Sequence, residues 1–199
     1  MKDKKLLSDI KEYLKCYENQ VLEDWYELIR HISVSETGEG IETCCDWIQK
    51  KMEEIGIQVT KYSVKPAPVL VGRFGNDPEK KTVLIYAHYD VKPAGERKLW
   101  HSDPFVPTVR DGKVYARGSA DNKSPLMAHL KALEYFIRRK MEVPVNVIFV
   151  FEGDEECGSR GLEEFLAEHR TELAADLVFF SDGPKDPSEI GRASCRERV

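Results

Sequence analysis

The stretch KTVLIYAHYD, from Lys81 to Asp90, places an almost continuous apolar run directly before a histidine and an aspartate. Such a run predicts a β-strand that is buried on both faces, as strands of a parallel sheet are. Side chains repeat every two residues along a strand, so His88 and Asp90 lie on one face. The strand therefore ends by presenting an imidazole and a carboxylate side by side.

Two further apolar runs of this kind follow, and helical patterns separate them. PVNVIFVFEG (144–153) and ADLVFFSDG (175–183) predict buried strands, whereas the apolar spacing of 123–139 and 159–170 predicts helices. Buried strands that alternate with helices predict an α/β fold with a mostly parallel sheet.

The remaining elements are predicted from the change of apolar period along the chain. Spacing typical of amphipathic helices covers 6–29 and 39–55, and a period of two begins at Ile57. The segments 57–64 and 69–74 therefore predict strands, and 112–118 predicts a short one.

Composition excludes several classes of protein. The chain has 199 residues, a net charge of −5, 41% hydrophobic and 33% charged residues, which gives no basic surface for nucleic acid. No apolar run approaches the length of about 18 residues that a membrane span needs, and the N-terminus lacks a signal-peptide core. Five cysteines without CxxC spacing indicate reduced thiols. We therefore expect a cytoplasmic protein.

Several polar residues fall at the ends of the predicted elements. His88, Glu155, Glu156 and Asp182 follow buried strands, and Asp121 precedes a helix. Each has an ordinary explanation when taken alone, because aspartate favours helix N-caps and turns, and an acidic loop is usually solvated. Ligand sites of parallel sheets form at the carboxyl edge, however, and all five residues are expected there.

A cation would explain why carboxylates converge at one edge. Burying several unpaired carboxylates beside one imidazole is costly, and a divalent metal relieves that cost. A set of nitrogen and oxygen ligands without thiolate suits zinc, with manganese or cobalt as alternatives. Asp90 is placed to accept the second ring N–H of His88 and so fix its tautomer.

Four ordered motifs together resemble a known family. HYD after an apolar strand, WHSDPFVPTVRDGKVYARGSADNK, FEGDEECGSRGL and SDGP are similar to the zinc metallopeptidase family of dipeptidases, aminoacylases and acetylornithine deacetylase. The likeness is greatest to the branch of carnosine and cytosolic non-specific dipeptidases, and it covers roughly residues 24–184. It implies an incomplete three-layer sandwich, the catalytic domain of a zinc peptidase.

The resemblance also implies a role for each site residue. His88 and Asp182 would bind one zinc, Asp121 would bridge two zincs, and Glu156 would bind the second. The motif DNKSP departs from the family pattern at Ser124, where a glycine is common. This departure affects the entry to the helix more than the metals.

Two more residues complete the implied mechanism. Glu155 would act as general base on a water held between the metals, and Asp90 would orient His88. The implied activity is hydrolysis of the amide bond of dipeptides, with a small peptide as substrate. An N-acyl amino acid deacylase of the same family, or a truncated metal-binding fragment without catalysis, are the alternatives.

The family pattern contains parts that this sequence does not match. It has a late histidine on the second zinc and an inserted lid and dimerisation domain. We therefore expect 1–188 to be the N-terminal part of the catalytic domain, and 189–199 to be a non-native or out-of-frame tail. The fragment is expected to be inactive, and a full-length parent to form a homodimer. His31, His101, His129 and His169 are interpreted as structural or surface residues.

Overall fold

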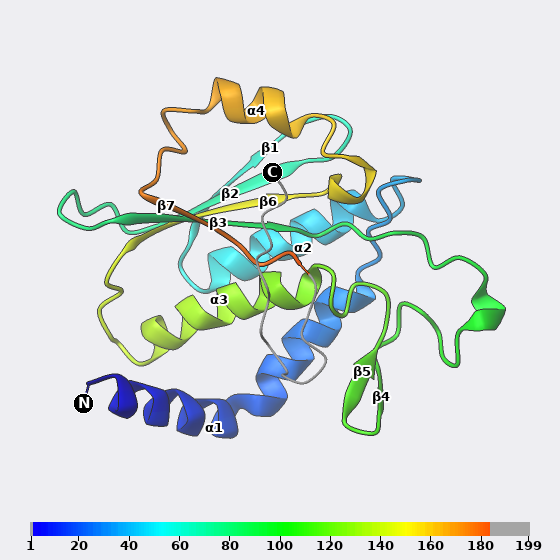
Figure 1. The fold of residues 1–199 in the computed structure, drawn as a ribbon, viewed down its shortest axis with the longest axis horizontal. Coiled ribbons are helices and arrows are strands. Elements are labelled where there is room, and N and C mark those ends of the chain that lie inside the picture. The colour runs from blue at the N-terminus through cyan, green and yellow to red at the C-terminus, as the bar shows by residue number, and fades with distance from the viewer. Residues whose placement is uncertain (1, 184–199) are drawn as a thin grey trace.

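The structure is a computed structural model that describes residues 2–183 (Figure 1). From residue 113 onward strands and α-helices alternate, as the apolar patterns predict. The elements are α1 (Lys2–Arg30), α2 (Ile41–Glu54), β1 (Gln58–Tyr62), β2 (Val69–Phe74), β3 (Thr82–His88), β4 (Thr108–Arg110), β5 (Lys113–Tyr115), α3 (Lys123–Arg138), β6 (Asn146–Glu152), α4 (Leu162–Glu168) and β7 (Leu177–Phe180). The tail predicted at 189–199 lies outside the described residues.

A five-stranded sheet in the order β1-β2-β6-β3-β7 forms the centre of the fold. β6, β3 and β7 run parallel, whereas β1 and β2 add an antiparallel edge. The α/β prediction is confirmed, and the strands that lead to the predicted site are the parallel ones. β4 was not predicted; it is three residues long and pairs only with β5 in a separate ribbon.

Helices cover both faces of the sheet and create three layers (Figure 1). The alternating side chains of β6 show the division: Phe149 and Phe151 pack into a core with α1, α2 and α3, and Ile148 and Val150 pack into a second core with Phe165 of α4. All seven residues of β6 are buried as a result. The predicted three-layer sandwich is confirmed.

β7 differs from the prediction of a third buried strand. Its four apolar side chains remain between 45% and 56% exposed. The strand lies at the edge of the sheet, where β3 is its only hydrogen-bonded neighbour among the described strands. An apolar run specifies a strand, but a strand is buried only where layers cover it.

The described residues also include no helix that combines the length and the apolar character of a membrane span.

Candidate metal centre

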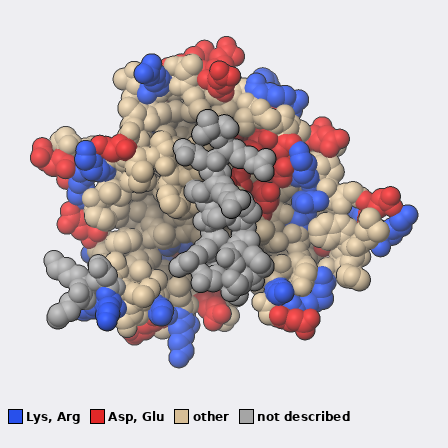
Figure 2. All heavy atoms as spheres, viewed as in Figure 1, with Lys and Arg blue, Asp and Glu red and all other residues tan. Residues whose placement is uncertain are grey.

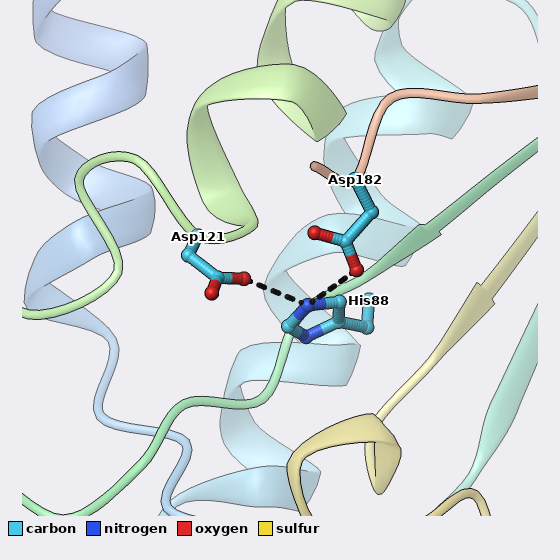
Figure 3. Close-up of side chains that lie close together, drawn as sticks. All are labelled: His88, Asp121 and Asp182. Atoms are coloured by element: carbon cyan, nitrogen blue, oxygen red, sulfur yellow. Dashed lines mark hydrogen bonds and ion pairs between the residues drawn. The ribbon is translucent and has the colours of Figure 1, made fainter. Parts of the chain in front are cut away.

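Three predicted residues meet at the carboxyl edge of the sheet (Figure 3). His88 ends β3, Asp121 lies in the loop before α3, and Asp182 follows β7. Nε2 of His88 lies 3.0 Å from Oδ1 of Asp121 and 3.4 Å from Oδ2 of Asp182. One ligand atom from each residue lies within 4.8 Å of the other two. Segments distant in sequence thus place one imidazole nitrogen between two carboxylates.

The pocket around His88 favours positive charge. The ring is fully buried, and burial opposes its protonation, but the surrounding aspartates outweigh that effect and raise the pKa of His88 to about 12. The hydrogen bond from His88 in turn lowers the pKa of Asp182. A metal ligand must be deprotonated, so a bound cation would replace the proton on Nε2. A buried imidazole with convergent carboxylates and no thiolate is a donor set that fits a divalent metal.

Asp90 is buried next to His88, and it has more hydrogen-bond partners than the one that the sequence predicts. Its Oδ1 lies 3.2 Å from Nδ1 of His88, on the side of the ring that faces away from Asp121. The same carboxylate accepts the backbone N–H of Glu155 at 3.2 Å and of Glu156 at 3.1 Å. Burial alone would raise the pKa of Asp90, but the hydrogen bond and charge of His88, together with the backbone N–H of Glu156, outweigh burial and lower the pKa. One carboxylate thus fixes the histidine and both glutamates relative to each other.

The two glutamates occupy different surroundings. Oε2 of Glu155 lies 3.7 Å from Nε2 of His88, and partial burial, with nearby carboxylates, raises the pKa of Glu155. The Glu156 carboxylate instead lies 3.6 Å from Nζ of Lys92. The structure therefore gathers four predicted carboxylates around His88, whereas among the described residues Glu156 has a lysine as its ion-pair partner. Figure 2 shows acidic and basic side chains together near the end of β6.

The loop that carries both glutamates is fixed by further side chains that sequence reasoning missed. Glu152, which is buried at the end of β6, accepts the hydroxyls of Tyr86 at 2.6 Å and Ser159 at 2.7 Å. Asp154 accepts Nε of Arg160 at 2.9 Å and Nη2 at 2.7 Å. An acidic run looks solvated in sequence, and no local signal separates its buried members from its exposed ones.

Two side chains near the start of α3 hold the segment that carries Asp182. Asn122 donates from Nδ2 to the carbonyl of Ser181 at 3.2 Å, and Nε2 of His129 lies 2.8 Å from the Ser181 hydroxyl. Burial lowers the pKa of His129, which keeps its imidazole neutral near pH 7. His129 therefore has a structural contact, and that contact is with the residue next to Asp182.

A short segment after α1 lies against the turn between His88 and Asp90. The Ser33 hydroxyl donates to the carbonyl of Tyr89 at 2.7 Å, and Val91 donates its N–H to the carbonyl of Ser33 at 2.8 Å. Ser35 also helps to lower the pKa of the Asp90 carboxyl. We call residues 33–35 the serine strap. No role was predicted for these residues, because they lie between the two predicted helices.

Comparison with known proteins identifies the family. The model described as peptidase family M20/M25/M40 matches residues 84–193, more than half of the chain. The chain belongs to this peptidase family. Its M20 relatives include the Cys-Gly metallodipeptidase dug1 of Schizosaccharomyces pombe, 43% identical over 69% of this chain. The Beta-Ala-His dipeptidase of Mus musculus is 41% identical over 58% of this chain and 24% of the relative.

A solved structure confirms the fold. Human carnosine dipeptidase 1 superposes with a TM-score of 0.85 at 29% identity, over 89% of this chain and 41% of that chain. The chain spans 31% of the length of the Schizosaccharomyces pombe relative. The family that the motifs predict is confirmed, together with the α/β catalytic fold.

Proposed function

We propose that this chain carries metal-binding and general-base residues of a zinc-dependent dipeptidase. The observation that carries the proposal is the cluster of His88, Asp121 and Asp182 at the carboxyl edge of the sheet. Parallel sheets form ligand sites at this edge, and the M20 relatives are named as metallodipeptidases and dipeptidases.

In this proposal His88, Asp121 and Asp182 would hold one zinc, and Asp121 and Glu156 would serve a second. The 4.8 Å grouping supports the first three ligands. Support for Glu156 comes from its backbone, which Asp90 fixes beside Glu155. Bound zinc would supply a Lewis acid that polarises the scissile carbonyl and lowers the pKa of water.

Glu155 is the proposed general base. Its carboxylate lies next to the cluster and is partly exposed, so a water molecule and a substrate are able to reach it. Its raised pKa favours uptake of a proton from the attacking water and transfer of that proton to the leaving amine. Asp90 orients His88 through Nδ1 and places Glu155 through the backbone N–H.

The proposed substrates are dipeptides, on the basis of the two relatives' names. The deacylase alternative uses the same residues on an N-acyl amino acid. The inactivity of the 199-residue chain, the homodimer of a full-length parent and the cytoplasmic location all stay predictions.

Zinc titration tests the metal centre directly. The purified chain competes with a chromophoric chelator for Zn²⁺. Loss of a residue that only hydrogen-bonds a metal ligand weakens metal binding by up to about 100-fold. Asp121→Ala or Asp182→Ala, which removes a proposed ligand itself, is therefore expected to weaken Zn²⁺ binding by more than about 100-fold. Equal affinities in all three proteins would refute the proposed ligands.

Glu155→Gln separates proton transfer from metal binding. Zinc affinity is expected to stay near that of the unsubstituted chain. In a full-length parent, dipeptide hydrolysis should fall about 10²–10⁴-fold, the usual contribution of a general base. Assays with dipeptides and N-acyl amino acids in parallel then choose between the two substrate classes.

A further inference from the structure

Lys123 is a buried lysine next to the candidate centre. It follows Asp121 by two residues, begins α3 and is only 1% exposed. Its Nζ donates to the backbone carbonyl of Leu28 at 3.1 Å and to that of His31 at 2.5 Å. Within the described part of the chain, no carboxylate lies within ion-pair distance of it.

Burying the Lys123 ammonium in this way costs folding free energy, which suggests that the charge has a role. Removing a lysine from water without a counter-charge is unfavourable, and a methionine of similar length would fill the space without that cost. The acceptors are carbonyls at the C-terminal end of α1, where the helix dipole concentrates negative charge. The hydrogen bonds to the carbonyls of Leu28 and His31 therefore fix the ammonium, and they also fix the position of the end of α1.

The two carbonyls lead directly into the serine strap. His31 lies two residues before Ser33, which contacts Tyr89 and Val91 on either side of Asp90. Lys123 itself begins α3, two residues after Asp121. A single side chain thus joins the segment that fixes His88 and Asp90 to the segment that presents Asp121.

We propose that Lys123 is a positioning residue, and that its ammonium sets the separation of His88 from Asp121 through the end of α1 and the serine strap. The inference rests on the proposed metal centre. In this proposal the C-terminal end of α1 is the fixed point to which the segments that carry His88 and Asp121 are both attached.

Lys123→Met tests this against a matched control, Lys131→Met. Lys131 lies two turns further along α3 and also reaches α1, through an ion pair with Asp24. Zn²⁺ affinity, the visible spectrum of the Co²⁺-substituted protein and the urea unfolding midpoint are measured for both. Lys123→Met should weaken Zn²⁺ binding about 10–100-fold and change the Co²⁺ spectrum, as loss of an outer partner does. Lys131→Met should lower the unfolding midpoint but keep affinity and spectrum.

Ser33→Ala covers the case in which Lys123→Met does not fold. It keeps the lysine and removes only the hydroxyl that links the strap to Tyr89. A several-fold loss of Zn²⁺ affinity with an altered Co²⁺ spectrum supports the inference. An unchanged affinity in either Ser33→Ala or a folded Lys123→Met overturns it, as do equal losses in the two lysine variants. If the unsubstituted chain binds neither ion, the proposed metal centre fails as well.

Discussion

β6 and β7 flank the same strand, β3, yet their side chains differ in burial. Both are apolar and both run parallel to β3, but every residue of β6 is buried and every residue of β7 is exposed. The loops that follow them differ in the same way. The loop after β6 is fixed by Asp90, Glu152 and Asp154, whereas the segment after β7 is held at Ser181 by two side chains near the start of α3. The candidate centre therefore has many side-chain hydrogen bonds on its β6 side and few on its β7 side.

The largest expected effect comes from truncating one phenylalanine in each strand. Phe149→Ala, in a side chain with no exposed surface, should lower the free energy of unfolding by about 3–5 kcal/mol. Phe179→Ala, at 45% exposure, should lower it by about 1 kcal/mol or less, because much of its surface already meets water. Urea unfolding of both variants gives the comparison. Losses of equal size would mean that β7 is covered in solution.

A smaller effect is expected from the support of the β7 side. His129→Phe keeps a ring beside Phe179 but removes the partner of the Ser181 hydroxyl. Zn²⁺ affinity should fall about tenfold, because Asp182 loses a fixed neighbour, while the urea midpoint changes little. His169→Phe is the matched control, since His169 lies at the end of α4 and pairs with Glu172. A tenfold loss in the control as well would remove His129 from the site.

The smallest effect concerns the β6 side and depends on pH. Burial raises the pKa of Glu152 above the ordinary glutamate value of 4.5, so the folded protein binds this proton more tightly than the unfolded chain does. The stability that the proton contributes is present below pH 4.5 and is lost as pH rises through the folded pKa. Glu152→Gln retains an oxygen for Tyr86 and Ser159 but cannot ionise. Its urea midpoint should therefore gain on that of the unsubstituted chain from about pH 4 towards pH 8.

An exposed glutamate of α4 provides the control for that titration. Glu164→Gln removes one carboxylate from the surface and should leave the pH dependence of unfolding unchanged. If the Glu152→Gln midpoint runs parallel to that of the unsubstituted chain, the burial of Glu152 does not influence stability in this range.

Local patterns in the sequence predicted the elements and the motifs, because a strand or a helix depends on neighbouring residues. The apolar run before His88 specified β3, and the residues at the strand ends led to the cluster that the structure assembles. Exposure of β7 was not predictable from its own residues, since burial depends on covering layers. Lys123 and the serine strap were missed for a similar reason: their contacts join segments that are far apart in the chain.

The strand order also determines when the centre is able to form during synthesis. β3 lies between β6 and β7, both of which are made later. At a translation rate of about 5–20 residues per second, His88 waits roughly 3–12 s for the start of β6, and longer for Asp182. Until then its strand has no partner, because β2 pairs with β1 and β6 and not with β3. On the ribosome, His88 is made early, and the three clustered side chains are all present only once Asp182 has been made, near the end of the described chain.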